Sequence, residues 1–157
     1  MIRNVTAIVA GLIAGSIFNM ALVSLSHAVY PLPDGIDPND FEAFRDHVQA
    51  NGMPTGALLI VLVAHAGGSF VSGLVCGLIA KRTWYIAAAA LGVLWMCGGI
   101  TMLMMLPAPM WFAVADTVLY VPVALLGVRL GGTLVGPPPQ PPTDEAYATL
   151  ALTDNLN

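Results

Sequence analysis

Residues 55–80 read TGALLIVLVAHAGGSFVSGLVCGLIA, and this run of 26 contains no aspartate, glutamate, lysine or arginine. An α-helix that crosses the hydrocarbon core of a bilayer needs about 20 mainly apolar residues. The stretch is longer than that minimum, so it predicts a membrane-spanning helix with room to tilt.

Three further stretches share this length and apolar character: Val5–Tyr30, Trp84–Leu106 and Met110–Leu130. Across all four stretches there is one acidic residue, Asp116, and one basic residue, Arg129. The chain is 57% hydrophobic and only 9% charged, whereas about a quarter of a soluble domain is charged. The sequence therefore predicts an all-α fold, with residues 1–136 forming a four-helix transmembrane bundle as a single domain.

The basic residues predict the orientation of this bundle. If the chain crosses four times, one side receives four of the five basic residues: Arg3, Lys81, Arg82 and Arg129. Basic residues are enriched in cytoplasmic loops. We therefore predict an integral membrane protein with both termini cytoplasmic (N-in, C-in), in a bacterial inner membrane. The first stretch is expected to remain as a span, because it exceeds the 7–15 apolar residues of a signal peptide.

Residues 31–54 form the predicted outer segment between the first two spans. In Asp37–Asp40 an acid suited to an N-cap precedes a proline suited to the first helical position. Phe41, Phe44 and Val48 then fall on one helix face. We predict a short amphipathic helix, about Pro38–Ala50, that lies on the outer surface with its aromatic face toward the membrane.

Two metal sites have weaker support. The acids Asp34, Asp37 and Asp40 offer oxygen ligands for calcium, but they lack the ordered spacing of an EF-hand. The third stretch is rich in methionine, whose thioether binds Cu(I), yet methionine is also a common apolar filler. We therefore expect no metal and no cofactor.

The two cysteines, Cys76 and Cys97, are expected to be free thiols. Their positions in antiparallel spans place them roughly 15 Å apart in depth. A disulfide requires Cα atoms within about 7 Å.

Small residues recur at every fourth position in the first two spans. The first reads Ala7-x3-Gly11-x3-Gly15-x3-Asn19, and the second reads His65-x3-Ser69-x3-Gly73-x3-Gly77. Spacing of four places each set on one helix face, and small residues let two backbones approach closely. We expect the first two spans to pack through these faces and to bring Asn19 near His65. The residues expected at the contact are Gly11, Gly15, Ser69, Gly73 and Gly77.

Four polar side chains are expected at a similar depth in the outer half of the membrane: Asn19, His65, Asp116 and Tyr120. A charged residue at such depth costs on the order of 2–3 kcal/mol on insertion scales. One interpretation is a hydrogen-bonded cluster that fixes the helix register. A second is a site for protons or cations, because histidine titrates near neutral pH. A third is a carboxylate hydrated near the headgroups.

Residues 137–157 form a proline-rich tail that is expected in the cytoplasm. The run PPPQPP at 137–142 favours a stiff polyproline II spacer,. Recognition of the same run by an SH3-like partner is the alternative.

No motif in the chain indicates a reaction or a cofactor. There is no HExxH pattern and no pair of carboxylates within one span. We therefore expect a non-enzymatic structural or accessory component that self-associates or packs in a larger membrane complex. Its expected partners are the lipid bilayer and other membrane subunits, without nucleic acid. The alternative is a small ion or proton channel, or a proton-coupled carrier, that uses the polar layer; a membrane enzyme ranks third.

Overall fold

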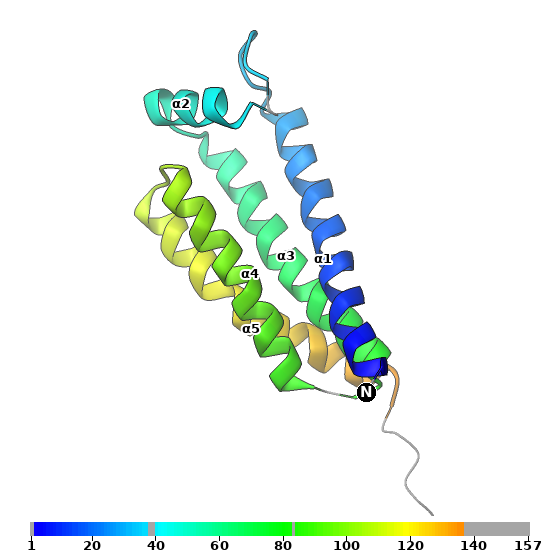
Figure 1. Ribbon diagram of the computed structural model, residues 1–157. Helices are drawn as coiled ribbons and strands as arrows, with labels where there is room; N and C mark the ends of the chain where they lie inside the picture. The colour runs from blue at the N-terminus through cyan, green and yellow to red at the C-terminus, as the bar shows by residue number, and fades with distance from the viewer. Residues whose placement is uncertain (1, 38–39, 83, 137–157) are drawn as a thin grey trace, which may run out of the picture.

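The computed structural model describes residues 2–37, 40–82 and 84–136, and this part of the chain is helical without strands (Figure 1). Its five helices are α1 (Ile2–Val29), α2 (Phe41–Asn51), α3 (Thr55–Ala80), α4 (Tyr85–Met105) and α5 (Met110–Leu134). The predicted tail at 137–157 lies outside the described residues.

Four of these helices, α1, α3, α4 and α5, are long and apolar enough to cross a membrane. The prediction of an all-α chain with four such helices is confirmed. Helix α3 begins and ends at the predicted residues, Thr55 and Ala80. Helix α5 continues past the predicted end at Leu130 to Leu134, so Arg129 lies inside its last turns. The chain leaves the helix at Gly136, whose φ of 70° is easily adopted only by glycine,.

The short helix α2 begins later than predicted. Its N-cap is Asp40, whose carboxylate accepts a hydrogen bond from the backbone N–H of Ala43 at 3.1 Å. The prediction that Asp37 caps a helix starting at Pro38 is therefore wrong, because the second acid of the run occupies the capping position. The helix ends at Asn51, and Figure 1 shows it lying across one end of the bundle.

Helix α3 lies at the centre of the arrangement. It packs along α1 on one side and along α5 on the other, while α4 packs mainly on α5. Helices α1 and α4 barely touch each other. In Figure 1 they stand on either side of α3 and diverge toward the end where α2 lies.

The contact between α1 and α3 uses a different face of α3 from the one predicted. A Cβ atom at Gly11 would overlap the carbonyl oxygen of Ser72, and one at Gly15 would overlap the carbonyl oxygen of Gly68. The face of α3 that meets α1 therefore runs through Gly68, Ser72 and Cys76.

Gly73 and Gly77 instead face α5. A Cβ at Gly73 would overlap the carbonyl oxygen of Ala124, and one at Gly77 would lie 2.7 Å from the carbonyl oxygen of Val128. The Ser69 hydroxyl also bonds to α5. The prediction that Ser69, Gly73 and Gly77 pack against the first span is therefore wrong. A central helix carries two faces of small residues, and spacing of four does not say which neighbour each face meets.

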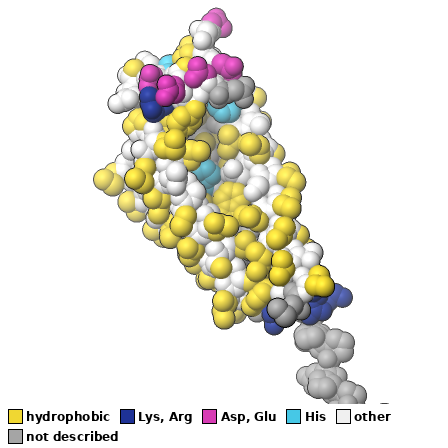
Figure 2. Space-filling view, viewed as in Figure 1, with side chains coloured by type: hydrophobic (Ala, Val, Ile, Leu, Met, Phe, Trp, Pro, Cys, Tyr) yellow, Lys and Arg dark blue, Asp and Glu magenta, His cyan; other side chains and the backbone are white. Residues whose placement is uncertain are grey.

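The charged side chains separate toward the two ends of the bundle. Figure 2 shows the acidic side chains gathered around α2, and lysine and arginine side chains at the opposite end. Between these ends the described cysteines Cys76 and Cys97 are both free, as predicted.

Candidate functional site

Three of the four predicted polar residues form one hydrogen-bonded group, the His65–Asp116–Tyr120 network. The distance from His65 Nδ1 to Asp116 Oδ1 is 2.8 Å. The Tyr120 hydroxyl lies 2.9 Å from Asp116 Oδ2 and 2.8 Å from His65 Nδ1. Helix α3 supplies the histidine and α5 supplies the other two residues.

The close packing of α3 on α5 holds this network in register. Asp116 and Tyr120 are four residues apart and therefore lie on one face of α5. The hydroxyl of Ser69, one turn from His65, donates to the backbone oxygen of Tyr120 at 2.7 Å. Gly99 of α4 lies behind the ring, where a Cβ atom would overlap the tyrosine hydroxyl. Small residues on two helices thus make room for the tyrosine.

Asp116 is almost completely buried, with 1% of its side chain exposed. A buried carboxylate is costly unless its oxygens receive hydrogen bonds. Here both oxygens have a partner, one from His65 and one from Tyr120. The His65 side chain is 16% exposed, so the network has one open face, at the histidine.

One arrangement of protons satisfies every contact in the network. The single hydroxyl proton of Tyr120 is donated to Asp116 Oδ2. The hydroxyl oxygen and Asp116 Oδ1 then both face His65 Nδ1, which must carry the proton that they share. When the imidazole is neutral, this arrangement of protons leaves Nε2 as the ring nitrogen without a proton.

The fourth predicted residue, Asn19, is near the network without being bonded to it. It comes from α1 and shares two cavities with His65. Its Oδ1 atom is buried and has no hydrogen-bond partner among the described residues. Asn19 therefore presents an unsatisfied acceptor beside the network.

A cavity of about 690 Å³ connects the network with the α2 end of the molecule. Its walls are mostly apolar and come from α1, α2, α3, α4 and the connecting loops at the α2 end, with Phe112 and Asp116 from α5. Figure 2 shows a hollow on this face, with histidine side chains in it and hydrophobic side chains along its rims. The polar lining residues are few: Asn19, Ser26, His27, Tyr30, His47, His65 and Asp116.

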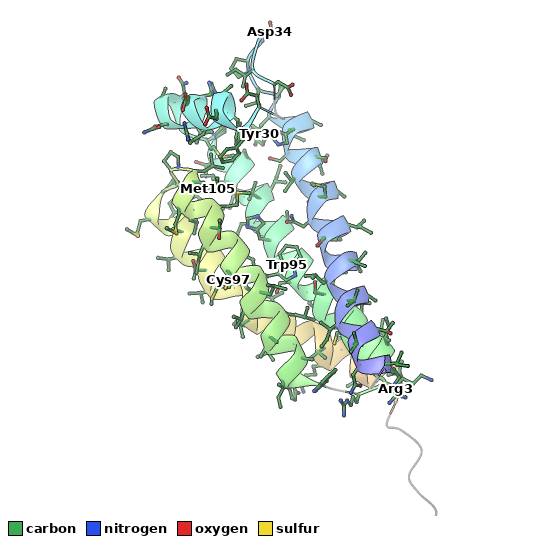
Figure 3. The ribbon with its side chains drawn as sticks, viewed as in Figure 1. Arg3, Tyr30, Asp34, Trp95, Cys97 and Met105 are labelled. Atoms are coloured by element: carbon green, nitrogen blue, oxygen red, sulfur yellow. The ribbon has the colours of Figure 1, made fainter. Side chains whose placement is uncertain are left out.

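A smaller cavity of about 290 Å³ continues from the network between α1 and α4. The two cavities share Asn19, His65, Gly99 and Met102. Trp95 lines the smaller one and donates its indole N–H to the Ser72 hydroxyl at 2.9 Å. Figure 3 shows Trp95 between α4 and α3. We call the two cavities together the α1–α4 cleft.

Sequence reasoning did not find the cleft or several of its residues. The hydrogen bond from Trp95 to Ser72 joins α4 to α3. His27 lines the large cavity, with its ring centroid 6.2 Å from that of Phe44 on α2. No local pattern reveals these roles, because they depend on the separation of α1 from α4.

The described residues contain no group of three or more histidine, cysteine, aspartate or glutamate side chains that could hold a metal ion. The cleft offers hydrogen-bonding side chains at its floor and near α2, and apolar contact along the rest of its walls. Comparison with models of protein families, with curated proteins and with solved structures finds no match to this chain.

Proposed function

We propose that this chain is an integral membrane protein that binds a small lipophilic molecule in the α1–α4 cleft, as a non-enzymatic accessory component. One observation carries the proposal: a largely apolar cavity of about 690 Å³ ends on the His65–Asp116–Tyr120 network. Small-molecule sites typically have about 300–1,000 Å³, apolar walls and a few placed polar groups. The cleft matches this description in volume and in lining.

The α2 helix supports the proposal by partly covering the cavity. Phe41, Phe44 and Val48 of α2 line it, and Val48 is 2% exposed. The apolar face of α2 is thus turned toward the cavity. A lipophilic molecule in the cleft is covered in part by α2 and meets mostly apolar side chains, with polar groups at the floor and near α2.

The distribution of charge supports a cytoplasmic location for both termini. Arg3, Lys81, Arg82 and Arg129 belong to the end opposite α2, and basic residues favour the cytoplasmic side,. A reporter fused after Asn157 is therefore expected on the cytoplasmic side, with one inserted after Gly35 outside. A C-terminal reporter on the outer face would contradict this orientation.

Filling the cavity tests the binding function. Val61 lines the large cavity one turn from His65, and Val61→Trp is expected to occupy part of it. In membranes treated with a photoreactive diazirine derivative of hexadecane, we expect the wild type to be labelled at Leu103, which lines the cavity. The Val61→Trp variant should lose that labelling, as measured by peptide mass spectrometry.

Two controls accompany this experiment. Val63→Trp makes the same change two residues away, at a side chain that is 59% exposed on the outer face of the bundle. It should leave the Leu103 labelling unchanged. Labelling of Met104, which is 84% exposed, reports contact with bulk lipid and should be equal in all variants. Equal labelling of Leu103 in the Val61→Trp and Val63→Trp variants would refute the proposal.

The 2.8 Å contact between His65 and Asp116 favours a second candidate, a proton-coupled carrier. Such a carrier needs polar groups toward both sides of the membrane. The residues of the small cavity farthest from α2 along their helices are Leu12, Ser16 and Leu94, which offer one hydroxyl. Proton flux into proteoliposomes that is abolished by Asp116→Asn would favour the carrier over the binding protein.

Self-association and docking with other membrane subunits remain predictions. The exposed apolar side chains of α1, such as Ile13 at 55% and Ile17 at 66%, suit contact with lipid or with another membrane helix. A lipophilic molecule can bind in the cleft whether α1 contacts lipid or another membrane helix.

A further inference from the structure

We propose that the molecule bound in the cleft carries a hydroxyl head group, whose proton is donated to His65 Nε2 or Asn19 Oδ1. The inference rests on the proposed binding function and adds the chemical class of the ligand. The class is a neutral lipophile with at least one hydroxyl and an apolar ring or chain.

The first step of the argument is the state of His65. Its Nδ1 is engaged with Asp116 and Tyr120. Its Nε2 has no hydrogen bond to a described residue, and the ring faces both cavities. Since Nδ1 carries the proton of the neutral ring, Nε2 is a hydrogen-bond acceptor. A ligand that donates a proton matches it.

The second step is Asn19. Its buried Oδ1 is a further acceptor without a protein partner, and it lines the same two cavities as His65. A buried polar atom without a partner carries a free-energy cost that a suitable ligand removes. Asn19 therefore supplies a second acceptor without a protein partner, at a residue that lines the same cavities as His65, and both acceptors select for a donor.

The third step is charge. Asp116 places one carboxylate beside the floor, and both of its oxygens are already bonded within the protein. A ligand carboxylate or phosphate at His65 is disfavoured by this neighbouring carboxylate. A ligand cation finds no free carboxylate oxygen, because the Asp116 side chain is 1% exposed. A neutral hydroxyl is not repelled by the Asp116 carboxylate and does not require a free carboxylate oxygen.

The remaining step is the body of the ligand. Above the floor most of the lining side chains are apolar and include Met20, Val61 and Leu103. Since α1 and α4 barely touch, the cleft opens toward the surrounding lipid. Two kinds of lipid-soluble molecule share the required chemistry, a hydroquinone with an alkyl tail and a long-chain alcohol.

Matched probes test the hydroxyl directly. The wild-type protein in nanodiscs is titrated with 1-dodecanol and its methyl ether, and with decylhydroquinone and its dimethyl ether. Binding is followed by native mass spectrometry. We expect at least one hydroxyl probe to bind about tenfold more tightly than its ether, as for one hydrogen bond to an otherwise unpaired buried acceptor. If only dodecanol binds more tightly than its ether, the ligand is assigned as a chain alcohol. If only decylhydroquinone does so, the ligand is assigned as a molecule with a hydroxylated ring.

Two variants connect this preference to the acceptors. His65→Asn keeps an N–H donor near the position of Nδ1, facing Asp116, but lacks Nε2. Asn19→Leu removes the second acceptor at a residue whose Oδ1 has no protein partner, so the fold should persist. At least one variant is expected to reduce the preference for the hydroxyl probe to near unity while still binding the ethers.

The outcomes separate the two proposals. If hydroxyl and ether probes bind equally, and Val61→Trp weakens both, the hydroxyl inference is wrong and the binding function stands. If Val61→Trp leaves the binding of every probe unchanged, the binding function itself is wrong. A hydroxyl preference that persists in both His65→Asn and Asn19→Leu would also overturn the inference, because it would place the hydroxyl elsewhere.

Discussion

Replacing His65 with leucine is expected to lower the free energy of unfolding by about 3 kcal/mol, the upper end of the usual cost of leaving a buried acceptor without its hydrogen-bond donor. The variant leaves Asp116, 1% exposed, with the Tyr120 hydroxyl as its only remaining partner in the network. Unfolding in mixed micelles with increasing dodecyl sulfate, followed by circular dichroism, measures the difference from wild type.

A compensated variant separates the charge from the packing. In His65→Leu, Asp116→Leu and Tyr120→Phe combined, the network is replaced by apolar side chains of similar size. Such replacements are often neutral or stabilising, so most of the lost stability should return. If the triple variant is as unstable as His65→Leu alone, the loss comes from the shape of the histidine and not from an unpaired carboxylate.

The four long helices were predictable because the length of an apolar run is a local property of the chain. Helix α3 has the predicted ends, since Pro54 precedes it and the polar pair Lys81-Arg82 follows it. The start of α2 was harder to predict from the sequence, because Asp37 and Asp40 both precede residues that can begin a helix. Asp40 is the N-cap because its carboxylate accepts a hydrogen bond from the backbone N–H of Ala43. Residue spacing alone does not distinguish Asp40 from Asp37.

The neighbours of α3 were not predictable from spacing. Small residues line two of its faces, through Gly68 and Ser72 toward α1 and through Gly73 and Gly77 toward α5. Four residues turn a helix by about 400°, so a run of spacing four drifts around the helix by about 40° at each step. The assignment of each face depends on how all four helices assemble.

The polar layer was located by counting depth along each span, which is why its four members could be named. The depth of a residue in the membrane does not say which residues of the neighbouring helices lie beside it. His65 meets Asp116 because α3 packs tightly on α5. Asn19 stays apart because it lies on α1, at the edge of the α1–α4 cleft. The cleft itself is a consequence of two helices, α1 and α4, that barely touch, and no pattern within one helix encodes that.

The face between α3 and α5 gives the second large effect. Gly73→Ala is expected to lower the free energy of unfolding by about 3 kcal/mol, the upper end of the usual cost of overpacking. The added Cβ would overlap the backbone oxygen of Ala124. No side-chain rotation can relieve an overlap with backbone, so α3 and α5 must move apart. The same unfolding titration in mixed micelles measures the effect.

Gly98→Ala is the matched control, because a Cβ at Gly98 has no other atom within 4 Å. Alanine has a higher helix propensity than glycine by about 1 kcal/mol, so Gly98→Ala should equal the wild type or exceed it slightly. Separation of α3 from α5 also separates His65 from Asp116, which lie on those two helices. Gly73→Ala should therefore weaken the binding of every probe in the cleft. Equal stability of the two alanine variants would contradict the observed backbone contact.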